Sequence, residues 1–155
     1  MLSHVDPQGR PGMVDVGDKQ PSDRRALALG EVQLPEELAA LFQDGEYHSP
    51  KGPVFQTAII AGTMAAKNCS SLIPFCHPLP IDGCRLEIEL QQRTVTIRCE
   101  VRVHHRTGVE MEALTAVSVA ALTVYDMCKA VTHAMVIGPI RLLEKEGGRH
   151  VVRQD

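Results

Sequence analysis

The chain has 155 residues, of which 44% are hydrophobic, and a formal net charge of -3 at pH 7. This length and hydrophobic content fit one globular domain over residues 1–155 and exclude an intrinsically disordered protein. The slightly acidic balance and the scarcity of aromatic residues (two Tyr, three Phe, no Trp) argue against nucleic-acid binding, and no apolar run is long enough to predict a membrane span.

The first half of the chain predicts one strand and two helices. Residues 1–23 are expected to be loosely ordered, and residues 24–34 alternate in hydrophobicity as a strand does. Pro35 opens a short helix to residue 43, and Pro53 opens a longer helix to about residue 69, because proline suits the first position of a helix. Residues 71–80 contain several prolines and predict a rigid loop.

The second half predicts a hairpin, a buried helix and a last strand. Residues 81–90 and 94–103 alternate with period two, which indicates two strands joined by a short turn. Residues 113–128 are apolar or small on almost every face, as in a buried helix. Residues 134–143 predict a strand, and residues 147–155 are expected to be loosely ordered. With the two early helices counted as one connection, the order is βαββαβ. This order predicts an α+β, ferredoxin-like fold, an antiparallel β-sheet with helices packed on one face.

The buried helix has charged residues at both ends. Glu110 and Glu112 near its start and Lys129 near its end complement the helix dipole and require no function. Asp126 lies near the end that the dipole makes unfavourable for an acid. Its ordinary explanation is an i,i+3 pair with Lys129, to which the spacing alone gives roughly one chance in three. The alternative is an acid–base pair that a rigid helix places in a site.

Two further positions are candidates for binding. Lys51 precedes the helix that opens at Pro53, where free backbone N–H groups favour an anion, although most surface lysines have no such role. His77 lies in the proline-rich loop. A loop histidine is a surface or hydrogen-bonded residue roughly two times in three, but a rigidly placed imidazole also suits binding or proton transfer.

The cysteines and the N-terminus indicate a cytoplasmic protein. The five cysteines are odd in number and contain no Cys-x-x-Cys spacing, which is typical of reduced thiols. Cys76, His77 and Cys84 are a weak metal signal because no second pair of ligands lies close in sequence, so no metal site is predicted. Residues 1–20 lack the apolar core of a secretory signal, so export is not expected.

Several segments share the pattern of one family. They read MVDV at 13–16, KGPVF at 51–55, AAK at 65–67, LIPFCHPL at 72–79, TGVEMEALTA at 107–116, SVAALTVYDMCKA at 118–130 and MVIGP at 135–139. In this order the chain resembles the cyclic pyranopterin monophosphate synthase family, the C protein of molybdenum cofactor biosynthesis. The resemblance implies a lyase that converts 3′,8-cyclo-7,8-dihydro-GTP into cyclic pyranopterin monophosphate and releases pyrophosphate, with no cofactor. It also implies a homohexamer, a trimer of dimers, with sites at a subunit interface.

The resemblance also assigns roles to individual residues. Asp126 takes the catalytic acid/base position, Lys129 is its catalytic partner, and Lys51 is a further catalytic lysine. The substrate-binding residues are Phe75, Cys76, His77, Glu110, Met111, Glu112, Lys19, Arg24 and Lys145. Opening a purine ring and closing a pterin requires proton transfers, which suit Asp, Lys and His, and loss of pyrophosphate requires cations.

Three residues depart from the family pattern, and one spacing constrains the site. His105, Arg106 and Arg149 stand where other residues are expected, which affects loop and tail contacts only. Glu112 and Asp126 are fourteen residues apart, so on one helix their Cα atoms lie roughly 21 Å apart. If both line one small site, different subunits supply them.

The alternative function is a non-enzymatic nucleotide-binding or regulatory module on the same scaffold, which would have no need for the proton-transfer pair.

Overall fold

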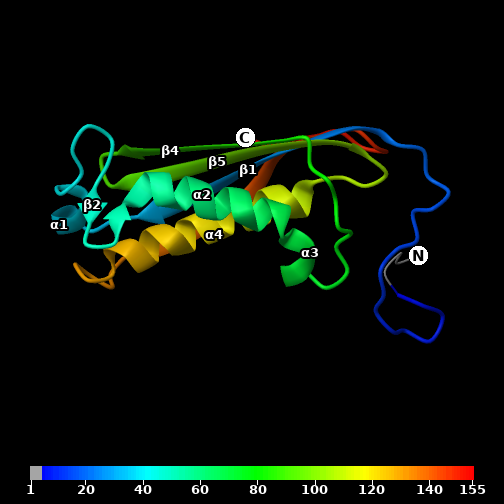
Figure 1. Cartoon of the computed structure of the whole chain (residues 1–155), viewed down its shortest axis with the longest axis horizontal. Helices are drawn as coiled ribbons and strands as arrows, with labels where there is room; N and C mark the ends of the chain where they lie inside the picture. Colours follow the sequence, from blue (N-terminus) through cyan, green and yellow to red (C-terminus); the bar gives the residue numbers. More distant parts are fainter. Residues whose placement is uncertain (1–4) are drawn as a thin grey trace.

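The computed structural model describes residues 5–155, and its main feature is a five-stranded antiparallel sheet (Figure 1). The strands are β1 (Ser22–Gln33), β4 (Gly83–Gln91), β5 (Thr94–His105), β6 (Val136–Glu146) and β7 (Val152–Arg153). Their spatial order is β4-β5-β1-β6-β7. The four long strands thus follow the second-third-first-fourth order of a ferredoxin-like fold, and the α+β prediction is confirmed.

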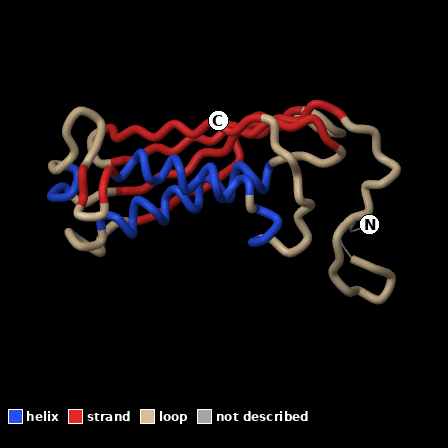
Figure 2. The backbone as a smooth tube through the Cα atoms, in the orientation of Figure 1, coloured by secondary structure: helices blue, strands red, loops and turns tan. Residues whose placement is uncertain are grey.

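The helices cover one face of this sheet. They are α1 (Glu36–Ala39), α2 (Val54–Lys67), α3 (Cys69–Leu72) and α4 (Glu110–Cys128). Figure 2 shows α2 and α4 running side by side along the sheet, and the two helices contact each other along their lengths. A small hairpin of β2 (His48–Ser49) and β3 (Gly52–Pro53) precedes α2 and places Lys51 at its turn.

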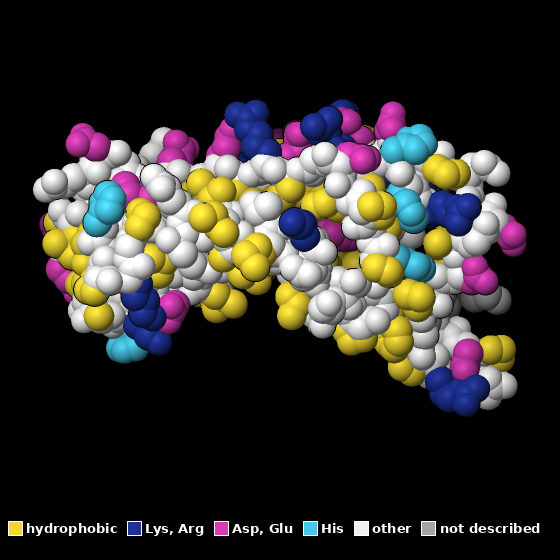
Figure 3. Space-filling view, viewed as in Figure 1, with side chains coloured by type: hydrophobic (Ala, Val, Ile, Leu, Met, Phe, Trp, Pro, Cys, Tyr) yellow, Lys and Arg dark blue, Asp and Glu magenta, His cyan; other side chains and the backbone are white. Residues whose placement is uncertain are grey.

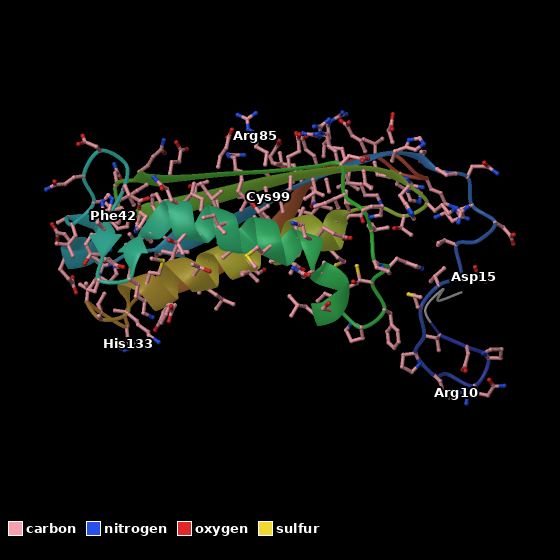
Figure 4. The ribbon with its side chains drawn as sticks, viewed as in Figure 1. Arg10, Asp15, Phe42, Arg85, Cys99 and His133 are labelled. Atoms are coloured by element: carbon pink, nitrogen blue, oxygen red, sulfur yellow. The ribbon has the colours of Figure 1, made fainter. Side chains whose placement is uncertain are left out.

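Alternation along the strands decides which face of the sheet is buried. In β5, Val95, Ile97, Cys99 and Val101 are fully buried beneath the helices, because side chains of a strand point to opposite faces in turn. Figure 4 places Cys99 between the sheet and the helix layer. The other face carries charges: Arg25 donates to Glu100 at 2.8 Å and to Glu144 at 2.7 Å. Figure 4 shows Arg85 pointing away from the helices on this charged face.

Helix α4 is the centre of the core. Ala113, Ala116 and Ala120 are fully buried, and these small side chains let α2 approach closely. A Cβ added at Gly62 of α2 would lie 3.0 Å from the carbonyl oxygen of Ala116. By length and composition α4 could cross a membrane, which the sequence analysis did not expect of any segment. Its burial against α2 and the sheet identifies it as the core helix of the domain.

Three segments differ from the sequence prediction. The helix predicted for residues 35–43 ends at Ala39, and a tight turn with positive φ at Asp44 and Gly45 follows. A separate one-turn helix, α3, forms at the start of the predicted proline-rich loop. The last strand, predicted for residues 134–143, covers Val136–Glu146.

Of the two predicted loose ends, the C-terminal tail contacts the folded sheet, and residues 1–4 of the N-terminal one lie outside the described residues. In the tail, β7 pairs with β6, and Gly147 and Gly148 both have positive φ. Any Cβ at these two glycines would collide with Asp23 or Arg24, so the tail passes directly over the Arg24 side chain. At the other end, residues 5–21 contain no regular strand or helix, apart from isolated bridges such as Val5 to Pro11.

Candidate active site

The predicted catalytic residues form one cluster at the C-terminal end of α4. Lys51 Nζ donates to Asp126 Oδ2 at 2.8 Å, and Lys129 Nζ lies 3.1 Å from Asp126 Oδ1. Each carboxylate oxygen thus has its own ammonium partner. The hydrogen bond from Lys51 and then the one from Lys129 hold the pKa of Asp126 below its usual value, so the carboxylate is charged at neutral pH.

The small hairpin positions Lys51 for this contact. Ser49 Oγ accepts a hydrogen bond from the Lys51 backbone N–H at 3.1 Å and donates to the Gly52 carbonyl at 3.2 Å. Gly52 has a φ of 116°, a conformation that side chains with a Cβ rarely adopt. The turn therefore directs Lys51 toward α4, although 75 residues separate it from Asp126. The i,i+3 pair of Asp126 and Lys129 is present, but it is only half of the cluster.

The cluster lines an open pocket of about 440 Å³. The side chains of Lys51 and Asp126 are 53% and 51% exposed, so water reaches the ion pair freely in the single chain. His133 lines the same pocket, and the Tyr125 hydroxyl holds it by donating to its carbonyl oxygen at 3.1 Å. His133 was not among the predicted site residues, because it lies in an irregular segment without a motif.

All nine predicted substrate-binding residues line a second pocket of about 400 Å³. They are Lys19, Arg24, Phe75, Cys76, His77, Glu110, Met111, Glu112 and Lys145. They come from four places in the fold: the N-terminal segment with the start of β1, the loop after α3, the first turn of α4 and the end of β6. The fold therefore brings this whole set together.

The deepest acid of this second pocket is Glu112. Its side chain is on the core side of the first turn of α4, and the residue is only 3% exposed. The Cys76 thiol donates to Glu112 Oε1 at 3.6 Å. Burial raises the pKa of Glu112 to about 7, and burial together with the Glu112 charge raises the pKa of Cys76 to about 12. Glu112 therefore lies in a poorly solvated part of the pocket, where its charged form is disfavoured and a thiol is its side-chain partner.

The N-terminal segment forms one wall of the second pocket. His77 Nε2 lies 2.7 Å from the Val14 carbonyl oxygen, so this ring nitrogen must donate a proton to it. The contact joins the loop after α3 to a segment that the sequence predicted to be loosely ordered. His77 is therefore a hydrogen-bonded loop histidine, and it also lines the pocket.

The cations of the second pocket are fixed by contacts within the chain. Lys145 Nζ lies 2.7 Å from Glu110 Oε1, and both side chains are about three-quarters covered. Arg24 is only 8% exposed, donates to Ser22 Oγ at 2.8 Å and reaches the Arg106 carbonyl at 3.4 Å. Anchored cations of this kind suit an anionic ligand, because little side-chain entropy remains to be lost.

The two pockets lie at opposite ends of α4. The fourteen residues between Glu112 and Asp126 span roughly 21 Å along one helix. In Figure 4, His133 marks the end with the Asp126 cluster, and Asp15 marks the N-terminal segment beside the second pocket. Within one chain, the predicted catalytic and binding residues therefore do not meet.

The comparisons with known proteins cover almost the whole chain. Residues 13–148 match the MoaC family. The chain belongs to the MoaC family. A cyclic pyranopterin monophosphate synthase of Xanthomonas campestris pv. campestris (strain B100) is 57% identical over 149 residues, which are 96% of this chain and 90% of that protein. A protein of the same name from Desulfitobacterium hafniense (strain DSM 10664 / DCB-2) is 50% identical over 157 residues, with coverages of 99% and 95%.

A larger relative shows the same unit inside a longer protein. The molybdenum cofactor biosynthesis bifunctional protein of Synechocystis sp. (strain ATCC 27184 / PCC 6803 / Kazusa) is 48% identical over 159 residues. The match covers 99% of this chain but 46% of that protein. The MoaC unit thus also occurs joined to a second part.

Two residues of the tail line the second pocket but were not predicted to bind substrate. Arg149 and His150 line the second pocket but lie outside the matched residues 13–148. Arg149 was treated only as a departure from the family pattern. The paired glycines before it were a usable signal, since two positive φ angles are needed to turn the chain over Arg24. His105, another departure, has a buried Nδ1 with no hydrogen-bond partner among residues 5–155.

Proposed function

We propose that this chain is a cyclic pyranopterin monophosphate synthase, a lyase of molybdenum cofactor biosynthesis that works in the cytoplasm. It converts 3′,8-cyclo-7,8-dihydro-GTP into cyclic pyranopterin monophosphate and pyrophosphate. Membership of the MoaC family and the names of the 57% and 50% identical relatives support this function. The observation that carries the proposal is the three-residue cluster in which Lys51 and Lys129 both contact Asp126.

The Lys51–Asp126–Lys129 cluster provides the proton transfers. Asp126 is ionised at neutral pH, so its carboxylate can accept a proton from the substrate, and the two lysines that lower its pKa contact the same carboxylate. Either lysine then donates a proton to the opening purine ring or to the closing pterin ring. A carboxylate between two ammonium groups can return to its starting state after each transfer, as ring opening followed by ring closure requires.

The second pocket holds the rest of the substrate. Lys19, Arg24 and Lys145 supply positive charge for a triphosphate and stabilise the pyrophosphate that leaves when the cyclic phosphate forms. Glu112 and the loop of Phe75, Cys76 and His77 face the purine. The buried carboxylate of Glu112 offers acceptors for ring N–H groups.

Two subunits build each complete site. One helix holds the two pockets roughly 21 Å apart, so a single substrate reaches both only if they come from different chains. Met111, Ser118, Leu122 and Asp126 follow one stripe of α4 at spacings of seven, four and four residues. A two-fold axis near the middle of this stripe places the two α4 helices antiparallel. Each second pocket then faces the partner's Lys51–Asp126–Lys129 cluster.

The helical face has the composition that such a dimer needs. Ile60 and Met64 of α2 and Leu122 of α4 are 62%, 56% and 59% exposed. Figure 3 shows apolar side chains spread over this face, whereas charges border the molecule along the sheet. Covering the stripe would also exclude water from the half-exposed Asp126 cluster, which strengthens its electrostatic action. Three such dimers would form the proposed hexamer.

The function is tested with the cyclised GTP intermediate as substrate. The purified chain should release pyrophosphate and cyclic pyranopterin monophosphate in equal amounts, measured by a coupled pyrophosphate assay and by mass spectrometry of the pterin. The Asp126→Asn protein is the matched negative control. Tight binding of the intermediate without product, by a folded protein with all twelve predicted residues intact, would instead identify a nucleotide-binding module.

A further inference from the structure

Two cysteines and the buried acid of the second pocket form a cluster with the geometry of a metal site. Cys69 Sγ lies 3.8 Å from Cys76 Sγ, and Cys76 Sγ lies 3.6 Å from Glu112 Oε1. The three ligand atoms all lie within 4.8 Å of one another. Cys69 and Glu112 are 2% and 3% exposed, and Cys76 is half-buried. Among residues 5–155, no other three acidic, cysteine or histidine side chains come this close.

The two shorter separations, both from Cys76, are those between ligands of a tetrahedral zinc ion, and the third edge, from Cys69 Sγ to Glu112, is within 4.8 Å. A Zn–S bond of about 2.3 Å and a tetrahedral angle put two sulfur ligands about 3.8 Å apart. With a Zn–O bond of about 2.0 Å, sulfur and oxygen lie about 3.5 Å apart. The Cys69–Cys76 and Cys76–Glu112 separations of 3.8 Å and 3.6 Å match both values. Closing the edge from Cys69 to Glu112 around an ion requires only a small shift of the side chains.

The arrangement leaves a fourth corner free on the pocket side. Cys76 and Glu112 line the second pocket, whereas Cys69 lies behind them at the start of α3. Thr115 Oγ1, 3.5 Å from Cys69 Sγ, is placed to hydrogen-bond that sulfur from outside the cluster. Three protein ligands with one open position are the usual arrangement of a zinc ion that also binds water or substrate.

We propose that Cys69, Cys76 and Glu112 bind one Zn²⁺ ion, with its fourth coordination position open to the second pocket. Sulfur ligands select a thiophilic cation such as zinc over Mg²⁺ or Ca²⁺, which take oxygen ligands. On binding, the two thiols lose their protons to the solvent and no atom changes oxidation state. This cluster has no signal in the sequence, because Glu112 is far from both cysteines in the chain and the packing of α3 against α4 brings them together.

The chain contains its own control for this site. Cys84 Sγ and Cys99 Sγ also lie 3.8 Å apart, but they belong to no such three-ligand cluster among residues 5–155. If close thiols alone were enough to bind the ion, this second pair would bind it as well. The proposal requires the carboxylate, so it predicts that only the pair beside Glu112 holds the metal.

The test is a titration of the metal-free, reduced chain with Co²⁺, which replaces Zn²⁺ in tetrahedral sites and reports thiolate ligands by its absorption. One Co²⁺ per chain should bind, with sulfur-to-metal absorption, and Zn²⁺ should displace it. Cys69→Ala, Cys76→Ser and Glu112→Gln should each weaken binding by more than about 100-fold, because loss of even an outer partner of a metal ligand costs about 10–100-fold. Cys99→Ala should bind as the wild type does.

Each outcome of the titration decides the proposal. Absence of thiolate absorption in the wild type at saturating Co²⁺ would overturn it, and so would unchanged binding by Cys69→Ala or lost binding by Cys99→Ala. Circular dichroism shows whether each variant is folded. Zn²⁺ should also raise the Tm of the wild type and of Cys99→Ala but not that of Cys76→Ser. The measurement uses no substrate, so it stands apart from the proposed lyase activity.

Discussion

At the residue scale, the proposed chemistry depends on Asp126 and its two lysine partners. Its spacing from Lys129 has an ordinary explanation as a helix-surface pair, and that pair is present at 3.1 Å. The shorter contact, 2.8 Å, comes from Lys51 on a distant hairpin. Residue spacing within a helix could not predict that second contact, and the family resemblance named Lys51 as catalytic without placing it beside Asp126.

Replacing Asp126 tests its chemical role. Asp126→Asn keeps the shape of the side chain and removes its ability to accept a proton, so turnover should fall by ~10²–10⁴-fold. Since the side chain is 51% exposed, the free energy of unfolding should change by no more than about 0.5 kcal/mol. Product formation and thermal unfolding measure the two effects. Glu37→Gln, at an exposed position of α1, is the control and should leave both unchanged. Near-normal turnover in a folded Asp126→Asn protein would contradict the role.

The two lysines should affect the pKa of Asp126 unequally. Lys51→Met removes the first and shorter contact, so the pKa of Asp126 should rise toward its ordinary value, and Lys129→Met should raise it less. A lowered pKa stabilises the fold above the ordinary pKa of the acid, and this stabilisation is lost as the pH falls through the lowered value. NMR titration of the Asp126 carboxyl carbon measures the change. Lys67→Met is the control, and an unaltered titration in Lys51→Met would exclude the ion pair in solution.

At the scale of elements, the period-two alternation predicted the long strands β1, β4 and β5, an opening proline predicted α2, and a long apolar run predicted α4. These signals extend over enough residues to outweigh local exceptions. The short elements were less predictable. One turn of helix, as in α1 and α3, leaves too few residues for a period, and its stability comes from packing. The path of the tail depends on Gly147 and Gly148, whose positive φ angles carry it over Arg24. That contact joins residues far apart in the sequence, so local patterns could not predict it.

Close packing of α2 on α4 depends on one glycine. A Cβ at Gly62 would lie 2.6 Å from Leu86 Cδ2 and 3.0 Å from the Ala116 carbonyl oxygen, so a larger side chain forces the helices apart. Gly62→Val should lower the free energy of unfolding by ~1–3 kcal/mol, the usual cost of overpacking. Denaturant unfolding measures it. Gln56→Val, at an exposed site of α2, controls for the β-branched side chain and should change little. Equal stability of the two variants would contradict the packing.

At the scale of the whole molecule, the family resemblance and the helix geometry together predicted the residues of the candidate site and their division between two ends of α4. The family resemblance named twelve residues, and the fold gathers them into two pockets. Helix length alone already placed Glu112 and Asp126 roughly 21 Å apart. The exposed apolar stripe between the pockets could not be predicted from the sequence. Every face of an all-apolar helix looks alike in sequence, and only the packing of the sheet and α2 against α4 decides which face stays exposed.

A charge in the middle of that stripe should separate the subunits. Leu122 is 59% exposed in the single chain, so Leu122→Asp should leave the fold intact and produce a monomer. Activity should fall to background, because neither pocket alone holds a complete site. Sedimentation velocity, circular dichroism and turnover are measured together. Arg85→Asp, on the opposite face of the sheet, is the control and should keep the oligomer of the wild type. A Leu122→Asp monomer with full activity would place the whole site in one chain.

Mixing two inactive proteins tests the shared site most directly. Glu112→Ala removes one end of the site and Asp126→Ala the other, so each homodimer should be inactive. After subunit exchange at equal amounts, half of the dimers are mixed. Each mixed dimer has two sites, of which one has both wild-type residues. About a quarter of all sites, and so about a quarter of wild-type activity, should therefore be recovered. A mixture of Asp126→Ala with Lys129→Ala, both altered at the same end, should recover none. Recovery of about a quarter in the first mixture alone is the predicted result. No recovery in the first mixture, with exchange verified by mass-labelled subunits, would contradict a site built from two chains.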